Sequence, residues 1–325
     1  MLSVLLAASA FGQEQACNTR NVFPWLEQTF GTWDKVRKDS LKIPSADRPW
    51  LIFFDESCVI HVDPDSSFSA GSFKKQVIGG ESFNISVIKH DGKITMPNRE
   101  EIPAGLITFA STYAGGKKSF LAAALPSIWR NDVNLKAEKN LDTLVRSVVV
   151  HELTHTYHRN FHARLDILEK QLPEVKNFND DVVQNTFGAN AYFRKLYESE
   201  HALLYQAIAE TRTKEKRNLA KKALEIIRER RTKFYSGPNK VYSEIEDIFL
   251  TMEGAANWAA FQSAMIEGVS VADATKLIRR SGKYWSQDEG FALFLVIDSL
   301  LPDWQKRAFG TSNASAVELL ADAVK

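Results

Sequence analysis

The chain has 325 residues, with 41 Lys and Arg against 40 Asp and Glu, and 44% of its residues are hydrophobic. These proportions are ordinary for a soluble globular protein, and they exclude an intrinsically disordered chain, a collagen-like repeat and a disulfide-rich scaffold. A net charge of +1 provides no overall field that would attract nucleic acid or an anionic membrane, so we expect neither as a partner. The binding partners must therefore be inferred from local sites.

Residues 1–16 are the predicted remnant of a signal peptide, because the apolar stretch that begins at Met1 closes on Ala8-Ser9-Ala10, a pattern typical of a secretory signal and its cleavage site. The stretch lacks a basic start, and a buried strand or helix is the alternative. A signal predicts a secreted or periplasmic protein, with a cytoplasmic protein as the alternative. No other apolar run approaches the ~18–20 residues that span a bilayer, so we expect no stable membrane insertion.

Cys17 and Cys58 are the only cysteines of the chain. An even number suits one disulfide in an oxidising compartment, and two buried free thiols are the alternative. A disulfide between them would therefore agree with the secreted or periplasmic location that residues 1–16 predict, and two free thiols would favour a cytoplasmic one.

Residues 17–140 are expected to form a sheet-rich N-terminal lobe. Runs of β-branched and aromatic residues between turn residues predict strands at Leu51–Phe54, Cys58–Val62, Phe83–Lys89, Gly105–Ala110 and Ser119–Leu125. The short spacing of these runs favours a twisted, mixed sheet in which most neighbouring strands are antiparallel.

Residues 141–325 are expected to form a mostly helical lobe. Apolar residues recur at helical spacing from Leu141 onward and through long segments near 190–235, 240–266 and 287–300. Strands followed by helices predict an α+β fold. The segment near 190–235 is the predicted helical arm, and its basic part, Arg212–Lys233, is either a solvated helix face or a surface that docks a partner.

The strongest functional motif is His-Glu-x-x-His at residues 151–155, within a helical stretch. Residues four apart lie on one face of a helix, so His151 and His155 can present two imidazole nitrogens to one ion. Imidazole suits Zn²⁺, and the carboxylate of Glu152 can then take a proton from water. The motif predicts one zinc ion per chain, and a chance match on an amphipathic helix is the alternative.

The motif and its surroundings resemble the gluzincin branch of the zinc metallopeptidases. In that branch a glutamate on a later helix, followed by Gly-x-Ala and an aromatic residue, is the third zinc ligand. This chain has Glu253-Gly254-Ala255-Ala256-Asn257-Trp258. The resemblance implies a zincin-like fold with the zinc cleft between the two lobes, Glu253 as the third ligand, and hydrolysis of a peptide or protein substrate.

The spacing of the two motifs departs from the family, because 97 residues lie between His155 and Glu253, more than in its best-known members. Glu200, on an equally helical stretch and nearer in sequence, competes as the third ligand. We favour Glu253, because Gly254 permits two helices to approach closely and the neighbouring alanines mark a buried helix in which an unpaired carboxylate would be costly. Glu200 has no such surroundings.

Three further side chains are candidates for contacts with the ligands or with the transition state. Tyr242 and Glu246 precede Glu253 by eleven and seven residues and share its helix face. Glu246 can thus orient a ligand histidine through its other ring nitrogen, and a solvated carboxylate is the alternative. Tyr284 begins a segment that resembles the helix after the glutamate helix in bacterial zinc-peptidase-like families.

His158 and His162 also fall on the face of the two ligand histidines by helical angle. On a straight helix, however, His158 lies about 10 Å along the axis from His151, too far to share its ion. We therefore expect both residues to contact the ligand residues and not the ion, or to be exposed.

Clefts of zincin enzymes usually have an edge strand before the metal helix, to which an extended peptide pairs. Ile107–Ala110 and Phe120–Leu125 are the candidates, and ordinary core strands are the alternative. The sequence as a whole predicts a zinc-dependent peptidase. The alternatives are a catalytically silent zincin-fold binding protein, against which the intact Glu152 argues, and a helical interaction protein that uses the basic segment.

Overall fold

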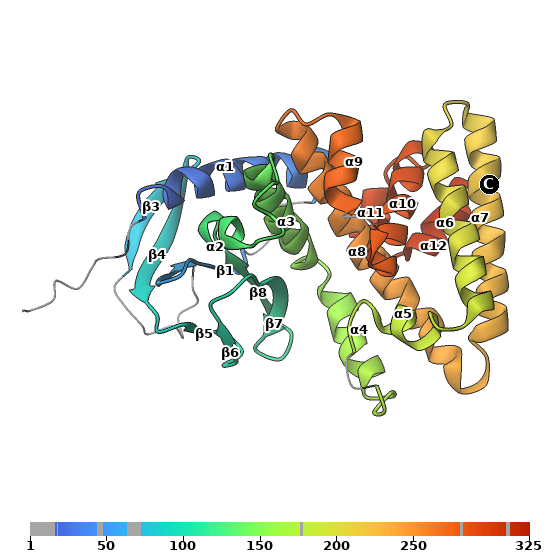
Figure 1. The fold of residues 1–325 in the computed structure, drawn as a ribbon, viewed down its shortest axis with the longest axis horizontal. Helices are drawn as coiled ribbons and strands as arrows, with labels where there is room; N and C mark the ends of the chain where they lie inside the picture. The colour runs from blue at the N-terminus through green and yellow to red at the C-terminus, as the bar shows by residue number, and fades with distance from the viewer. Residues whose placement is uncertain are drawn as a thin grey trace, which may run out of the picture.

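The computed structural model describes residues 17, 19–43, 48–63, 73–175, 178–279, 282–309 and 313–325, so the predicted signal at residues 1–16 lies outside the described residues. The N-terminal part is built around a six-stranded sheet, and the C-terminal part consists of helices (Figure 1). The two parts lie side by side along the longest axis of the molecule (Figure 1). The predicted α+β fold is confirmed.

The strands are β1 (Trp50–Phe54), β2 (Cys58–Val62), β3 (Lys74–Ile78), β4 (Glu81–Lys89), β5 (Lys93–Thr95), β6 (Glu101–Pro103), β7 (Thr108–Tyr113) and β8 (Lys118–Ala124). The main sheet has the order β3-β4-β2-β1-β8-β7, and β5 and β6 form a separate two-stranded sheet. β1 and β8 run parallel, with Ile52 opposite Ala122, and the other neighbours in the main sheet are antiparallel. β3 and β7 are its two edges.

The interior strands lie where the sequence predicts them, because their apolar residues are buried: β1 and β2 are buried at every position. The strand expected at Gly105–Ala110 begins at Thr108 instead and continues to Tyr113. Of the two candidates for an edge strand, β7 is the edge and β8 lies between β1 and β7. The sequence does not predict β3, since its first four residues are exposed and polar residues dominate it.

The helices are α1 (Val22–Lys35), α2 (Pro126–Asn131), α3 (Leu141–His155), α4 (Arg159–Glu169), α5 (Val182–Phe187), α6 (Ala191–Ala209), α7 (Thr213–Phe234), α8 (Val241–Ile266), α9 (Val271–Arg279), α10 (Trp285–Leu300), α11 (Trp304–Ala308) and α12 (Ala316–Ala323), with a π-helical turn η1 (Val36–Ser40) and a 3-10 turn η2 (Gly237–Lys240). α3 lies between the two parts (Figure 1). Val145 and Val149 belong to the core of the sheet part, whereas Val150 belongs to the core of the helical part.

The predicted helical arm near 190–235 is a hairpin of two helices, α6 and α7, on one side of the helical part (Figure 1). α7 buries Leu224 and Ile227 in the helical core, and the side chain of Arg230 is completely buried. The basic segment is therefore an amphipathic helix of the core, not a projecting arm. Lys221, Lys222, Arg228 and Lys233 are exposed, in agreement with the solvated face that the sequence predicts, whereas Arg231 is mostly covered and pairs with Glu246 and Asp247.

α8 and α10 cross at two glycines. A Cβ atom on Gly254 would lie 2.4 Å from the carbonyl oxygen of Gly290, and a Cβ atom on Gly290 would lie 2.7 Å from that of Leu250. The close helix approach predicted at Gly254 is confirmed. This crossing positions the turn of α8 that carries Glu253.

Two features bear on the compartment of the protein. Cys17 and Cys58 form a disulfide that connects the segment before α1 to β2, so the alternative of two free thiols is wrong. Disulfides are rare where thiols are kept reduced, and the bond therefore indicates an oxidising compartment. Among the described residues, no helix combines the length and the hydropathy that crossing a membrane requires.

Candidate metal centre

The site is built on two antiparallel helices, α3 and α8. At one end of their contact, Arg146 forms a two-pronged ion pair with Glu267, with nitrogen–oxygen distances of 2.6 and 2.7 Å. Next to it, the hydroxyl of Ser263 donates to that of Ser147 at 3.0 Å. Because residue numbers rise along α3 as they fall along α8, this register brings the following turns of α3 beside the turn of α8 that carries Glu253.

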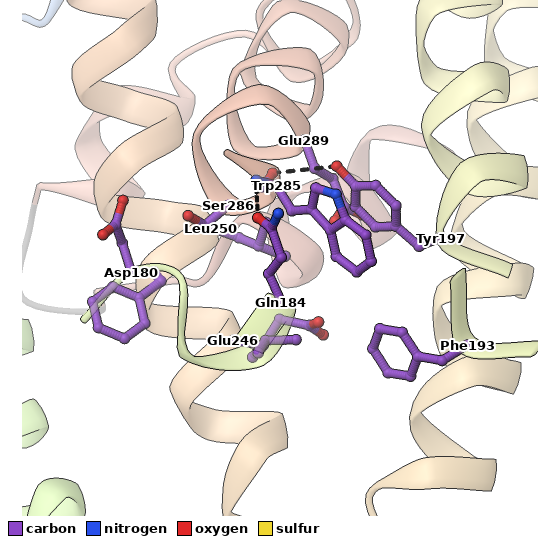
Figure 2. A pocket seen from close by; sticks show the side chains of 11 residues that line it. Asp180, Gln184, Phe193, Tyr197, Glu246, Leu250, Trp285, Ser286 and Glu289 are labelled. Carbon is purple, nitrogen blue, oxygen red and sulfur yellow. Dashed lines mark hydrogen bonds between the residues drawn. The ribbon is translucent and has the colours of Figure 1, made fainter. Parts of the chain in front are cut away.

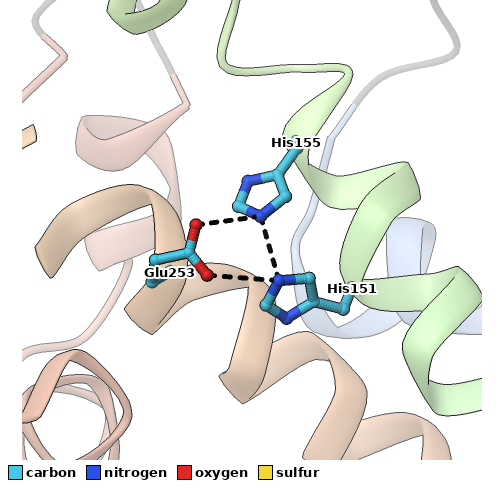
Figure 3. A group of neighbouring side chains, drawn as sticks. All are labelled: His151, His155 and Glu253. Atoms are coloured by element: carbon cyan, nitrogen blue, oxygen red, sulfur yellow. Dashed lines mark hydrogen bonds and ion pairs between the residues drawn. The ribbon is translucent and has the colours of Figure 1, made fainter. Parts of the chain in front are cut away.

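The three predicted ligands converge at this point (Figure 3). The Nε2 atoms of His151 and His155 lie 3.0 Å apart. In the carboxylate of Glu253, Oε2 lies 3.3 Å from the nitrogen of His151 and Oε1 lies 3.3 Å from the nitrogen of His155. All three donor atoms lie within 4.8 Å of one another, so the group could hold a metal ion.

Burial sets the charge state of this group. It lowers the pKa of the His155 imidazole to about 3, although the nearby Glu253 carboxylate acts in the opposite direction. His155 is therefore neutral near pH 7, as a metal ligand must be. Burial also raises the pKa of the Glu253 carboxyl, and no Lys or Arg in the described part of the chain forms an ion pair with it. A bound cation would offset the cost of burying this carboxylate.

Asn257 orients His151. Its side-chain amide donates to the carbonyl oxygen of Gln287 at 3.1 Å, which leaves the amide oxygen to accept from Nδ1 of His151 at 3.0 Å. This contact places the proton of His151 on Nδ1, so that Nε2 presents its lone pair to the other donor atoms. This role was not predicted from the sequence, although Asn257 lies one helical turn after Glu253 and thus on the same face.

Glu152 lies at the edge of the sheet. Its Oε2 accepts a hydrogen bond of 2.9 Å from the backbone N–H of Ala110 in β7. Since Glu152 follows His151 directly, this bond holds the expected proton acceptor between the metal group and the edge strand.

The metal group and Glu152 open onto a cleft of about 460 Å³. Its walls come from β7, from α3, α4, α8 and α10, and from the segment before α5; the lining residues are Phe109, Ala110, His151, Glu152, His155, His162, Leu165, Asp166, Glu169, Phe178, Asn179, Asp180, Phe249, Met252, Glu253 and Gln287. Gln287 donates to the carboxylate of Asp180 at 3.0 Å. Burial and the charge of Glu253 raise the pKa of Asp180 to about 6, so this side chain is mostly ionised near pH 7.

Glu246 does not have the role that the sequence predicts for it. Its Oε1 accepts from Arg230 at 2.6 Å and from Tyr235 at 2.7 Å, and its Oε2 accepts from Arg231 at 2.8 Å. It is thus neither a partner of a ligand histidine nor solvated. Seven residues correspond to about 10 Å along a helix, and at that distance from Glu253 the buried guanidinium of Arg230 is the nearer partner. Figure 2 shows Glu246 beside a cavity of about 20 Å³, room for about one water molecule.

The two predicted tyrosines also lie away from the metal cleft. Tyr242 is buried and its ring meets that of Phe187 edge-on, with centroids 5.0 Å apart. Tyr284 is 38% exposed and lines a separate small cavity with Arg279. Neither tyrosine lines the cleft, so the structure supports no contact of either with the metal group or with a substrate there.

Glu200, the competing third ligand, is completely buried, which corrects the expectation that it lacks a buried setting. Its carboxylate pairs with Arg230 at 2.6 Å, and this guanidinium is shared with Glu246 in the helical core. Of these two glutamates, only Glu253 belongs to the histidine group.

His158 and His162 follow the end of α3, which stops at His155, so the argument from a straight helix does not apply to them. His158 is buried, not exposed, and its ring stacks on Phe309 with centroids 5.0 Å apart. His162 lies on α4 and lines the cleft. Neither belongs to the metal group, as the sequence predicts.

Known proteins provide no independent support for this site. Comparison of the chain with protein-family models, with curated proteins and with solved structures finds no match. The resemblance to gluzincins therefore stays a prediction, and the function must be argued from the geometry of the site.

Proposed function

We propose that this protein is a zinc-dependent peptidase that hydrolyses peptide bonds. The observation that carries the proposal is the buried group of His151, His155 and Glu253, which opens onto a cleft beside Glu152 and an edge strand. Two histidines and one carboxylate are a ligand set of catalytic zinc sites, whereas closed structural sites use four protein ligands.

The spacing of the donor atoms fits zinc. Zinc–nitrogen and zinc–oxygen bonds of about 2.0–2.2 Å in a tetrahedron require neighbouring ligand atoms about 3.3–3.6 Å apart. Each nitrogen lies 3.3 Å from a different oxygen of the Glu253 carboxylate, and the nitrogen–nitrogen distance of 3.0 Å is shorter than this range. Larger cations such as Ca²⁺ prefer six to eight oxygen ligands, which this group does not offer. One zinc ion per chain is therefore the cofactor of the proposal.

The residues around the zinc site have distinct roles in the proposed reaction. A zinc ion at this site would polarise the scissile carbonyl and lower the pKa of a water molecule towards ~7. Glu152 takes one proton from this water and passes it to the leaving nitrogen. The remaining hydroxyl joins the carbonyl carbon as the C–N bond breaks, so the products are an amine and a carboxylic acid, which loses its proton to the amine or to solvent near pH 7.

The edge strand β7 provides the means of holding a substrate. An edge strand has backbone groups that can pair with an extended peptide. Phe109 and Ala110 of β7 line the cleft, and Ala110 also binds Glu152. A peptide that pairs with β7 would therefore cross the cleft next to the proposed proton acceptor.

Metal analysis tests the zinc site. We expect purified protein to contain about one zinc ion per chain and the double variant His151→Ala/His155→Ala to contain none. In chelator competition, Glu253→Gln should weaken zinc binding far more than the control Glu200→Gln, because Glu200 pairs with Arg230. Unchanged zinc content in the double variant would refute the site.

Substitution of Glu152 tests the reaction. Glu152→Gln has the same shape but cannot accept the proton, so we expect about 10²–10⁴-fold slower cleavage of a peptide mixture with zinc content and thermal stability retained. Wild-type turnover in this variant would place the proton acceptor elsewhere. A zinc-loaded wild type that cleaves no peptide in the mixture would identify a binding protein instead.

We further propose that the protein is secreted or periplasmic. The disulfide and the apolar pattern at residues 1–16 both support this location over a cytoplasmic one. Mass determination of the mature N-terminus in material from the native host would test it, since a chain that retains residues 1–16 would contradict export through a cleaved signal.

A further inference from the structure

The proposed catalytic cleft is acidic in a protein that is almost neutral. Besides Glu152 and Glu253, its lining includes the carboxylates of Asp166, Glu169 and Asp180, and none of the described residues that line it is Lys or Arg. The net charge of the whole chain is +1. The negative charge is therefore a local property of the cleft and not a consequence of the overall composition.

One wall of the cleft carries a row of acids on α4. His162, Asp166 and Glu169 are spaced by four and three residues, so they lie on one face of this helix. These three side chains extend about 10 Å along the helix axis, and the two acids, Asp166 and Glu169, are about 4.5 Å apart along it. Neither side-chain carboxylate forms a hydrogen bond or an ion pair with any residue that the structure describes, although the charge of Asp166 acts on the neighbouring His162. Arg164 of the same helix lies outside the cleft lining and pairs with Glu244.

The other walls combine one further acid with apolar surface. The carboxylate of Asp180 lines the cleft and accepts a hydrogen bond from the amide of Gln287. It has no Lys or Arg partner among the described residues. Phe178, Phe249 and Met252 also line the cleft. The walls thus offer apolar surface together with several anionic groups, a combination that suits the long apolar stem and cationic end of Lys or Arg.

We infer that the substrates of the cleft are basic peptides, with Lys or Arg side chains close to the scissile bond. This inference rests on the proposed function for the location of the site, and the acids determine only which substrates fit it. Asp166, Glu169 and Asp180 are the specificity-determining residues. A peptide with acidic side chains at the same positions would meet like charges and is disfavoured.

Binding measurements separate this inference from the proposed reaction. Two fluorescein-labelled peptides of identical length, one with three lysines and one with three glutamines at the same positions, are titrated against zinc-loaded Glu152→Gln protein and followed by fluorescence anisotropy. The lysine peptide should bind about threefold to tenfold more tightly at low ionic strength, since exposed ion pairs are individually weak. This advantage should fall as salt is raised to about 0.5 M. Equal Kd values for the two peptides at low salt would overturn the inference.

Charge variants assign the preference to α4. Asp166→Asn/Glu169→Gln should reduce the ratio of the two Kd values towards one, and Asp166→Lys/Glu169→Lys should reverse the preference in favour of a matched glutamate peptide. The control Glu198→Gln/Glu225→Gln changes the net charge by the same amount as the neutralising variant, at exposed positions on α6 and α7 outside the cleft lining. A control variant that loses the preference equally would also overturn the inference.

Cleavage of the same two peptides by the wild-type enzyme reports on the proposed function separately. Tighter binding of the lysine peptide without cleavage of either peptide would remove the peptidase proposal and retain the basic-ligand site. Cleavage of both peptides with equal kcat/KM and equal Kd would retain the peptidase and remove the substrate preference.

Discussion

At the residue scale, Asn257 connects the metal group to α10. It accepts from His151 with its oxygen and donates to the backbone of Gln287 with its nitrogen. The side chain of Gln287 in turn donates to Asp180 in the cleft. One residue of α10 therefore positions both a ligand histidine, through Asn257, and an acid of the substrate cleft.

Removal of this positioning contact should weaken metal binding. We expect Asn257→Ala to lower zinc affinity by about 10–100-fold, because partners that orient ligand histidines typically contribute this much. Ser263→Ala is the matched control, since it removes a buried hydrogen bond between α8 and α3 that does not involve a ligand. Chelator competition measures both variants. Equal zinc affinity in wild type and Asn257→Ala would show that His151 is oriented without Asn257.

The residues that could be predicted from the sequence are those whose relation is local. His151 and His155 lie side by side because residues four apart are about one helical turn apart. This relation depends on the local helix alone and needs no contact with another part of the chain. Asn257 shares the helix face of Glu253, but its bonds to His151 on α3 and to Gln287 on α10, like that of Asp180 to Gln287, are contacts between distant segments that the sequence does not reveal. The prediction for Glu246 is wrong for the same reason, since Arg230 approaches it from another helix.

At the element scale, the crossing of α8 and α10 determines where Glu253 lies. Gly254→Ala should reduce the free energy of unfolding by about 1–3 kcal/mol, because the added methyl group would meet the backbone of Gly290. Urea unfolding measures this change. Gly31→Ala is the control: it adds a methyl group in α1 where no atom lies within 4 Å, and it should stabilise the protein by up to about 1 kcal/mol. Equal effects of the two substitutions would contradict the tight crossing.

The long elements were predictable because their apolar residues repeat over several turns, as in α8 and in the start of α3. β3 was not, since four of its five residues are exposed. The break between α6 and α7 was also missed, because the residues between Ala209 and Thr213 include no Gly or Pro to mark it. Strand β3 is defined by its pairing with β4, and the break between α6 and α7 is defined by the packing of the two helices. Both depend on tertiary contacts, which the local sequence does not show.

At the scale of the whole molecule, the disulfide connects cysteines that are 41 residues apart in the chain. Closing a loop of this length stabilises a protein by about 4 kcal/mol in the chain-entropy model. We therefore expect Cys17→Ser/Cys58→Ser to lower the free energy of unfolding by an amount of this order. Chemical unfolding of the variant, and of wild type with and without a reductant, measures it. Wild type that unfolds identically in the presence and absence of reductant would contradict a stabilising bond.

The position of α3 has a consequence for how the molecule unfolds. Its two faces belong to two different hydrophobic cores, and two of the three donor atoms lie on it while the third lies on α8. A bound ion would thus connect the two halves and contribute about 4 kcal/mol when free metal exceeds Kd a thousandfold. We expect the sheet half and the helical half to unfold in one cooperative transition when the metal is bound. Chelation should remove this contribution, so that the less stable half unfolds first.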